Sequence, residues 1–290
     1  MLKGSFVALI TPFTKDEEID YPRLKKLIEW HIESGTDGLV ILGTTGESPT
    51  ITFEEQKSIL TFVVKQVKGR IHVMVGAGSN DTRTSIIKCE AFEALGADSL
   101  LVITPYYNKT NDSGAIKHFE MIADQVHIPI FIYHVPSRTG YQLPISVIEK
   151  LSHHPNIVGI KEASGNISYA MSLSSVLSEN FIMFCGNDDI VVPMMSIGAV
   201  GVISVWANIC PVEVKALVDN FANNSELSLK IQQKYLNLIH TLSIETNPIP
   251  VKFALKSLAK DNGIYRLPLD EPSEENKKLI KQSLKEVGLL

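Results

Sequence analysis

Short apolar runs rich in β-branched residues alternate with amphipathic stretches along most of this chain. By the rules of hydrophobic periodicity, eight strand–helix pairs follow one another with short connections. The pairs, strand first, are 6–10 with 21–34, 38–42 with 53–67, 71–75 with 82–95, 99–104 with 114–125, 129–135 with 145–152, 157–164 with 168–177, 181–185 with 191–197, and 202–205 with 212–223. Gly35, Gly69, Gly96 and Gly198 stand near helix-to-strand junctions, where helix C-caps favour glycine. Eight such units in about 220 residues predict an α/β fold of the (β/α)8, or TIM barrel, type.

The main competing architecture is an open, doubly wound parallel sheet. No G-x-G-x-x-G turn, which dinucleotide-binding sheets carry after their first strand, follows residues 6–10. The alternation ends after the eighth unit, where 227–243, 251–258 and 274–287 are expected to be helices. The sequence therefore predicts a barrel over residues 1–224 and a C-terminal helical region over 225–290.

Composition excludes several classes of protein. Apolar residues make up 44% of the chain and charged residues 20%, a balance typical of folded globular proteins. The formal net charge of −5 provides no basic footprint for nucleic acid or an anionic membrane. The start lacks the features of a signal peptide, and no apolar run reaches the roughly 18 residues that span a bilayer. Cys89, Cys185 and Cys210 are widely spaced, which disfavours disulfides and a zinc site and suits a reducing compartment. We expect a cytoplasmic protein that binds neither nucleic acid nor membrane.

Lys161 interrupts an apolar run, 157–164, that otherwise predicts a buried strand. Ionised lysine is rarely buried, because burial strips water from its charge. Burial lowers the pKa of a lysine amine from about 10.4, and a neutral amine attacks ketones to form a Schiff base. Alternation puts Gly159 and Ala163 on the same strand face as Lys161, which leaves room for a small substrate. The alternative is a lysine that extends to solvent from a strand end or pairs with a carboxylate.

Active sites of such barrels lie at the C-terminal ends of the strands. The segments at these ends carry hydroxyls, an arginine and Lys161; they are Gly43-Thr44-Thr45-Gly46-Glu47, Thr104-Pro105-Tyr106-Tyr107, 133–140, Gly186-Asn187-Asp188-Asp189 and 204–208. This set is poor in metal ligands and rich in groups that move protons and hold a carboxylate. We therefore expect no metal, and a phosphosugar aldolase is disfavoured because Asp188 and Asp189 would repel a phosphate.

These residues also have structural interpretations. Tyr133 could simply fill the barrel core, whereas His134 points to the opposite face, toward the helices, where we expect a structural role. Thr44 and Thr45 could be turn residues or a helix N-cap. An arginine in a loop, such as Arg138, is most often solvated, and its functional interpretation is a bidentate clamp on a carboxylate.

Three motifs occur together, and their combination is far more specific than any one residue. They are Gly43-Thr44-Thr45-Gly46-Glu47, Tyr133-x-x-Pro136-x-x-Thr139-Gly140 and Gly159-Ile160-Lys161-Glu162. Together they closely resemble the dihydrodipicolinate synthase/N-acetylneuraminate lyase family of class I aldolases. The likeness covers nearly the whole chain, including Asn247-Pro248-Ile249-Pro250-Val251-Lys252 and the final Gly288-Leu289-Leu290. Thr45 and Arg138 resemble the residues at these positions in the branch of the family that uses aspartate 4-semialdehyde. Lyases of sugar acids usually lack an arginine at the position of Arg138.

The resemblance implies a reaction. Lys161 would condense with pyruvate to an imine, which becomes an enamine and attacks the aldehyde of aspartate 4-semialdehyde on the way to lysine and diaminopimelate. No cofactor is needed, since the imine is itself the electron sink. Tyr133, Thr44 and a neighbouring subunit's Tyr107 would relay protons, so the protein would be a homo-oligomer, commonly a dimer of dimers. The substrate-binding groups implied are Thr45 for the pyruvate carboxylate, Arg138 for the semialdehyde carboxylate, and the main chain at Gly186 and Ile203.

The resemblance is incomplete at an effector site. Relatives that lysine inhibits bind it at a dimer interface near the positions of Ser48, Asn80 and Tyr106, which this chain retains. That site usually has histidine, or another polar or aromatic group, at positions 53 and 56, and a glutamate at 84; this chain has Phe53, Gln56 and Thr84. Without the glutamate, bound lysine loses a charged hydrogen bond worth roughly 1.5–3 kcal/mol. We expect weak or absent inhibition by lysine.

Two other function classes remain open from sequence. A different pyruvate-dependent lyase of the family would act on a sugar acid or a hydroxy-oxo acid, and Thr45 and Arg138 argue against it. A non-catalytic paralogue that binds or regulates would usually have lost the lysine or the tyrosine. This chain keeps both Lys161 and Tyr133.

Overall fold

Within residues 2–290, which the computed structural model describes, eight parallel strands close into a barrel. The strands are β1 (Gly4–Ala8), β2 (Gly38–Ile41), β3 (His72–Gly76), β4 (Ser99–Ile103), β5 (Ile130–His134), β6 (Ile157–Glu162), β7 (Ile182–Cys185) and β8 (Ala199–Ser204). They pair in chain order, and β8 returns to pair with β1. The predicted (β/α)8 barrel is confirmed.

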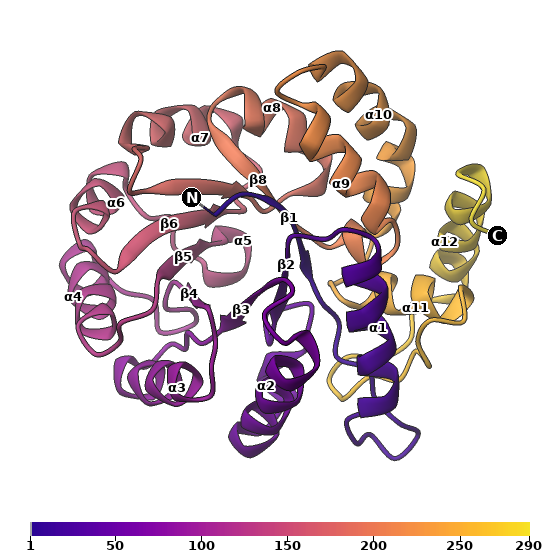
Figure 1. The fold of residues 1–290 in the computed structure, drawn as a ribbon, viewed down its shortest axis with the longest axis horizontal. Coiled ribbons are helices and arrows are strands. Elements are labelled where there is room, and N and C mark those ends of the chain that lie inside the picture. Colours follow the sequence, from indigo (N-terminus) through magenta and orange to yellow (C-terminus); the bar gives the residue numbers. More distant parts are fainter. Residues whose placement is uncertain (1) are drawn as a thin grey trace.

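Helices surround the strands and cover the outside of the barrel (Figure 1). They are α1 (Tyr21–Glu33), α2 (Phe53–Val67), α3 (Thr82–Ala94), α4 (Asp112–Ala123), α6 (Ile145–Ser152), α7 (Ile167–Leu173), α8 (Val191–Ser196) and α9 (Pro211–Asn220). Capping residues in the sequence set the ends of these helices. For example, α2 begins with a capping box formed by Thr52 and Glu55. The four glycines expected at C-caps have φ between +71° and +105°, a region that favours glycine.

The C-terminal helices lie along one side of the barrel (Figure 1). They are α10 (Ser225–Thr241), α11 (Ile249–Ser257) and α12 (Glu274–Glu286), close to the predicted ranges. Helix α10 packs against α8 and α9, and α12 packs against α10 and α11. Buried Leu238, Leu255 and Leu284 join these helices to the hydrophobic core outside the strands.

A second apolar cluster fills the interior of the barrel. Its members are Phe6, Ala8, Val40, Met74, Leu101, Phe131, Tyr133, Val135, Ala163, Ile182, Phe184 and Ile203. The Phe184 ring packs edge-on against Phe6 and Phe131, with ring centroids 5.1 and 5.9 Å apart. The small Ala8 and Ala163 stand where β1 and β6 end. The barrel is therefore a packed core with space left at the C-terminal end of its strands.

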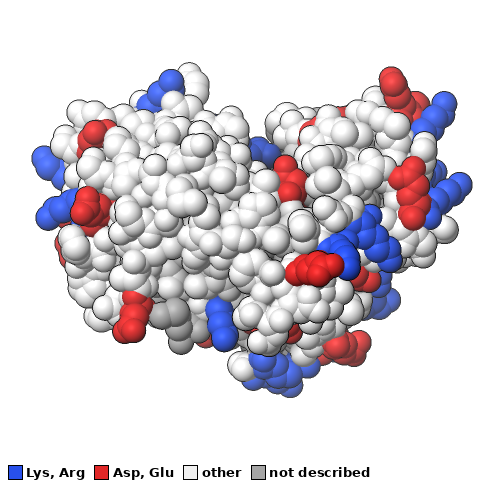
Figure 2. All heavy atoms as spheres, turned by 90° about the horizontal axis from the view of Figure 1, so that it is seen from above, with Lys and Arg blue, Asp and Glu red and all other residues white. Residues whose placement is uncertain are grey.

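Charge is mixed over the surface. On the face drawn in Figure 2, basic and acidic side chains are interspersed and neither sign forms a broad patch. No helix among residues 2–290 is both long and apolar enough to cross a membrane.

Candidate active site

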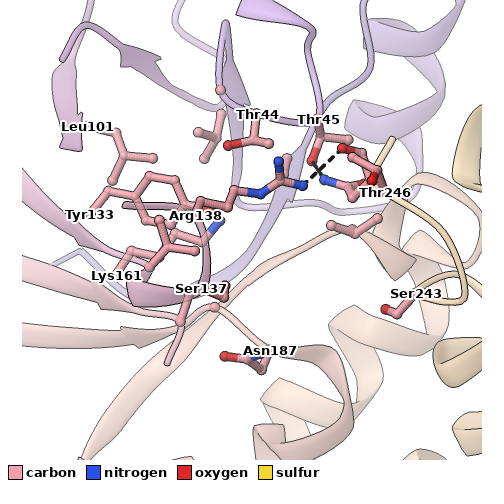
Figure 3. A pocket seen from close by; sticks show the side chains of 18 of the residues that line it. Thr44, Thr45, Leu101, Tyr133, Ser137, Arg138, Lys161, Asn187, Ser243 and Thr246 are labelled. Atoms are coloured by element: carbon pink, nitrogen blue, oxygen red, sulfur yellow. Dashed lines mark hydrogen bonds between the residues drawn. The ribbon is translucent and has the colours of Figure 1, made fainter. Parts of the chain in front are cut away.

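Lys161 lies on β6, and its side chain points into the barrel near the open end (Figure 3). It is only 6% exposed. Its register partner on β5 is Tyr133, whose side chain also points inward. The Lys161 Nζ atom lies 4.6 Å from the centroid of the Tyr133 ring. No salt bridge joins Lys161 to any carboxylate within residues 2–290, so the amine is buried without a charged partner.

Glu162 follows Lys161 but faces the helices, because successive strand residues point to opposite faces. Its Oε2 accepts a hydrogen bond from His134 Nδ1 at 2.5 Å, and its Oε1 accepts one from the Ser164 backbone N at 2.7 Å. His134 Nε2 in turn accepts from the Leu143 backbone N at 3.3 Å. The expected outward direction of His134 is confirmed. The Glu162 carboxylate is hydrogen-bonded on the helix side of the sheet and points away from Lys161.

A cavity of about 440 Å³ opens at the mouth of the barrel (Figure 3). It brings together most of the predicted site residues, namely Lys161, Tyr133, Thr44, Thr45, Arg138 and Gly186. A Cβ at Gly186 would stand 3.0 Å from Lys161 Cε and 2.6 Å from Ala163 Cβ, so glycine leaves the lysine its room. One cavity thus holds an amine, a phenol, a guanidinium and the carboxylate of Glu245, together with the hydroxyls of Thr44, Thr45, Ser137, Ser243 and Thr246.

The loop that carries Thr44 and Thr45 is anchored by a second buried lysine. Glu47, at the end of this loop, has φ of +57°. Its Oε1 lies 2.5 Å from Lys252 Nζ of α11, and both side chains are fully buried. The same Nζ donates to the backbone carbonyls of Thr11 and Ile264. The C-terminal region therefore holds the threonine loop in place.

Sequence reasoning missed Asn247, which joins two of the predicted site residues. Its Nδ2 donates to Thr45 Oγ1 at 2.9 Å, and its backbone O accepts from Arg138 Nη2 at 3.0 Å (dashed lines in Figure 3). Arg138 comes from α5 (Pro136–Thr139), a single turn after β5 that the sequence pattern does not predict. The sequence signal that could have identified Asn247 was its place in the stretch Asn247-Pro248-Ile249-Pro250-Val251-Lys252, which the family resemblance covers.

Other predicted residues lie outside this cavity. Tyr107 has φ of +67° and is 92% exposed. Ile203 packs in the inner apolar cluster, and Val205, two residues later, reaches the cavity instead. Thr44 and Tyr133 both line the cavity, but no hydrogen bond joins them in the described part of the chain. The expected proton relay is therefore not assembled within a single chain.

A second cavity, of about 430 Å³, adjoins the first and shares Thr44, Tyr133 and Arg138 with it. Of the three residues expected at an effector site, Ser48 and Tyr106 line this cavity, whereas Asn80 does not. Its other polar lining residues are Gln56, Ser79, Thr84 and Lys88. Within residues 2–290 no Asp or Glu lines it. Burial lowers the pKa of Lys88, so the cavity is polar and has no negative charge to hold a cation.

Asp188, the first of the two aspartates after β7, stabilises the loop that follows β8. Asp188 Oδ2 accepts hydrogen bonds from the backbone N of Val205 at 2.9 Å and of Trp206 at 2.8 Å. Burial raises the pKa of Asp188, and hydrogen bonds from the Ser204 side chain and from the backbone N of Trp206 and Val205 oppose this rise. Among the described residues, no group of three His, Cys, Asp or Glu side chains could hold a metal ion.

Comparisons with known proteins agree with this geometry. The pattern of the dihydrodipicolinate synthetase family matches residues 1–287. The chain is 46% identical to the 4-hydroxy-tetrahydrodipicolinate synthase of Thermoanaerobacter pseudethanolicus, over 100% of this chain and 98% of that one. The crystal structure of dihydrodipicolinate synthase from Aquifex aeolicus is similar at a TM-score of 0.96 and 42% identity over 99% of each chain. The chloride-inhibited dihydrodipicolinate synthase from Acinetobacter baumannii, complexed with pyruvate, is similar at a TM-score of 0.97 and 38% identity over 100% of each chain.

Proposed function

Because this chain belongs to the dihydrodipicolinate synthetase family, and is thus a lyase, we propose that it condenses pyruvate with L-aspartate 4-semialdehyde to 4-hydroxy-tetrahydrodipicolinate. The reaction serves the biosynthesis of lysine and diaminopimelate in the cytoplasm. The names of the relatives support these substrates. The observation that carries the proposal is the buried amine of Lys161, 4.6 Å from the Tyr133 ring in an open cavity.

The chemistry begins at Lys161. Its amine attacks the ketone carbon of pyruvate, and loss of water leaves an imine. Loss of a proton from the adjoining methyl group gives an enamine, whose carbon attacks the aldehyde carbon of the semialdehyde. The semialdehyde's amino group then attacks the imine carbon, which closes the ring and releases the free Lys161 amine. The imine accepts the electron pair of the broken C–H bond, and the enamine returns that pair to the new carbon–carbon bond, so no cofactor enters these steps.

Tyr133 moves the protons in these steps. Its hydroxyl is in the same cavity as the Lys161 amine, and general acid–base groups must stand within reach of the reacting atoms. Thr44 lines the same cavity and orients the phenol. Tyr107, which is exposed on a single chain, enters the cavity of a neighbouring subunit to complete the relay. The active form is therefore a homo-oligomer, arranged as a dimer of dimers.

Two groups hold the substrate carboxylates. Thr45, whose hydroxyl is fixed by Asn247 Nδ2, binds the carboxylate of pyruvate. Arg138 presents a guanidinium to the cavity and binds the carboxylate of the semialdehyde with paired hydrogen bonds. The main chain of Gly186, beside Lys161 Cε, shapes the floor around the imine. The main chain of Ile203, whose side chain packs in the inner apolar cluster, supports this floor from inside the barrel.

A comparison of two assays tests this function. Purified protein is given pyruvate with aspartate 4-semialdehyde, and separately a sialic acid to cleave. We expect condensation in the first assay and background rates in the second, with condensation lost in Lys161→Met. Cleavage of the sugar acid without condensation of the semialdehyde would assign the chain to a different lyase.

A further inference from the structure

A buried acid–base pair lies directly behind the two central residues of the active site. On β5 and β6, Tyr133 is the register partner of Lys161, and the next residues, His134 and Glu162, are partners of each other. Successive strand residues point to opposite faces, so the inner pair, Tyr133 and Lys161, faces the cavity and the outer pair, His134 and Glu162, faces the helices. The side chains of the outer pair are 0% and 1% exposed. Because each outer residue follows an inner one along its strand, the outer pair constrains where the inner pair can stand.

Hydrogen bonds and stacking hold both side chains of the outer pair in one orientation. The Leu143 backbone N donates to His134 Nε2, so the ring proton is on Nδ1 and is donated to Glu162 Oε2. The other carboxylate oxygen of Glu162 accepts from the Ser164 backbone N at 2.7 Å. The His134 ring also stacks on the Tyr169 ring of α7, with centroids 4.9 Å apart, and the Tyr169 hydroxyl donates to the Leu143 carbonyl at 2.7 Å. The outer pair therefore ties the ends of β5 and β6 to the segments that follow them.

The backbone of the outer pair also supports the walls around the lysine side chain. The His134 carbonyl accepts from Ala163 N at 2.9 Å, and the Glu162 carbonyl accepts from Gly186 N at 2.7 Å. Ala163 and Gly186 line the active-site cavity together with Lys161. A Cβ at Gly186 would stand 3.0 Å both from the Glu162 carbonyl O and from Lys161 Cε, so this part of the cavity has little spare room. A shift of the outer pair would move these walls as well as the lysine.

The pairing of β5 with β6 is irregular below the active site. Ile130 pairs with Ile157 but Phe131 pairs with Gly159, so the ladder passes over one residue of β6. Such an irregularity disrupts the ladder locally and bends the strand. Contacts nearer the C-terminal ends must therefore fix how the two strands align at the cavity, and the hydrogen bond of the outer pair is such a contact.

Stability alone does not account for an acid and a base at this place. Side chains that face the helices from other strands are mostly apolar, such as Ile41 of β2, Val75 of β3 and Val102 of β4. Replacing a buried ion pair by apolar residues of similar volume is often neutral or stabilising, and the best-attested benefit of such a pair is to fix register.

We propose that His134 and Glu162 are positioning residues, which hold the Lys161 amine and the Tyr133 hydroxyl at the separation that imine formation and proton transfer require. The inference rests on the proposed function and adds two residues to it. Both side chains lie on the helix side of the sheet, so they act through the inner pair and not on a substrate. Placement matters to the rate because reacting groups must be held in a near-attack geometry.

The groups proposed to hold the substrate carboxylates are anchored separately. Thr45 and Arg138 are both hydrogen-bonded to Asn247, which lies beyond the eighth strand–helix unit. Loss of the outer pair should therefore slow the chemistry at Lys161 more than it weakens binding of the semialdehyde.

Mixing with pyruvate, followed by borohydride at increasing times, measures two quantities. The final fraction of chains trapped counts the folded active sites, and the time course gives the rate of imine formation per site. Glu162→Gln has one carbonyl oxygen for two donors, so it loses the hydrogen bond from His134 or the one from Ser164 N. We expect it to lower the rate per site and kcat about 10- to 100-fold, as for a reacting group displaced by up to about 1 Å. KM for the semialdehyde should change little.

His134→Leu and His134→Asn are matched variants. Leucine removes the donor and should slow the reaction as Glu162→Gln does, whereas asparagine keeps an N–H donor near the place of Nδ1 and should restore most of the rate. Val75→Ala, on the helix side of β3, is the control for lost packing. It can lower the fraction trapped but should leave the rate per site unchanged.

The outcomes separate positioning from stability. An unchanged rate per site in Glu162→Gln and in the His134 variants that fold, with a loss only in the fraction trapped, would mean that the pair merely stabilises the barrel and would overturn the proposal. Equal losses in His134→Asn and His134→Leu would also overturn it, because the retained donor would then have no effect. An unmodified protein that traps no pyruvate would instead refute the proposed function.

Discussion

Lys161 and Lys252 are both buried lysines with different surroundings. Lys252 pairs with Glu47 and with two backbone carbonyls, so all of its donors are committed to the fold. Lys161 has no carboxylate partner in the described chain and faces an open cavity. Burial alone therefore does not identify an imine-forming lysine. We therefore base the proposed imine-forming role of Lys161 on a buried amine that lacks a carboxylate partner and borders empty space.

We expect Tyr133→Phe to lower kcat by about 10²- to 10⁴-fold, the usual contribution of a general acid–base group. The fold should be retained, because the phenylalanine ring still fills the inner cluster. Steady-state kinetics with pyruvate and the semialdehyde measure the effect. Tyr141→Phe is the matched control, since the Tyr141 hydroxyl donates to Asp112 at the surface. An unchanged kcat in Tyr133→Phe would remove the phenol from proton transfer.

Sequence could predict the site residues that stand on strands, since period-two alternation puts Lys161 and Tyr133 on the inner face. The segments at the strand ends likewise pointed to Thr44, Thr45 and Arg138. The sequence could not predict the role of Asn247, which contacts Arg138 across 109 positions of the chain. That contact depends on where the chain returns after α10, and no local pattern encodes it.

At the scale of elements, strand ends were harder to predict where glycine is involved. The pattern predicts that the eighth strand begins at 202, whereas β8 begins at Ala199. Glycine has low β-propensity, so Gly201 weakens the strand signal. In the barrel, a Cβ at Gly201 would stand 2.0 Å from the Gly4 backbone O of β1. The close approach of β8 and β1 that closes the barrel requires this glycine.

Helix α11 stabilises the loop after β2 through Lys252, and this can be measured. We expect Lys252→Met to lower the free energy of unfolding by about 3–5 kcal/mol, because it leaves the Glu47 carboxylate buried without its cationic partner. Urea denaturation measures this change. Lys256→Met, on the same helix, breaks only a solvent-exposed pair with Glu271 and should cost no more than about 1 kcal/mol. Similar losses in the two variants would show that the buried pair does not anchor the loop.

The cavity between the first turns of α2 and α3 is expected not to respond to lysine. No Asp or Glu among residues 2–290 lines it, and Lys88 would repel the ammonium group of bound lysine. Initial rates should therefore be unchanged at millimolar L-lysine. Thr84→Glu restores a carboxylate to this cavity and should raise sensitivity. Inhibition of the unmodified protein at micromolar lysine would contradict the prediction.

At the scale of the whole molecule, the barrel and the C-terminal region build the site together. Lys161 and Tyr133 come from strands, whereas Ser243, Glu245 and Asn247 close the cavity from beyond the eighth strand–helix unit. The sequence pattern predicts a C-terminal helical region, but periodicity does not reveal that its connecting segment covers the barrel mouth.

Stability should fall in mild acid because two buried histidines stay neutral. Burial lowers the pKa of His31 to about 3 and that of His118 to about 4, against about 6.5 in an unfolded chain. At a pH between the pKa of the folded state and that of the unfolded state, the unfolded chain binds protons that the folded chain does not. The free energy of unfolding therefore falls as pH drops below about 6.5, by up to about 1.4 kcal/mol per pH unit for each histidine.

Urea denaturation at neutral pH and near pH 5 measures this slope. His118→Gln should reduce it by the share of one histidine. His127→Gln, at a side chain that is 95% exposed, should leave it unchanged. A slope that does not differ between His118→Gln and the unmodified protein would refute the assignment.

Borohydride reduction in the presence of pyruvate, followed by peptide mass mapping, tests the central role of Lys161 most directly. We predict one reduced pyruvate adduct, on the peptide that contains Lys161, and none on the peptide that contains the fully buried Lys252. The adduct should disappear in Lys161→Arg. A protein that traps no pyruvate, or that traps it on any other lysine, would contradict the Schiff-base mechanism.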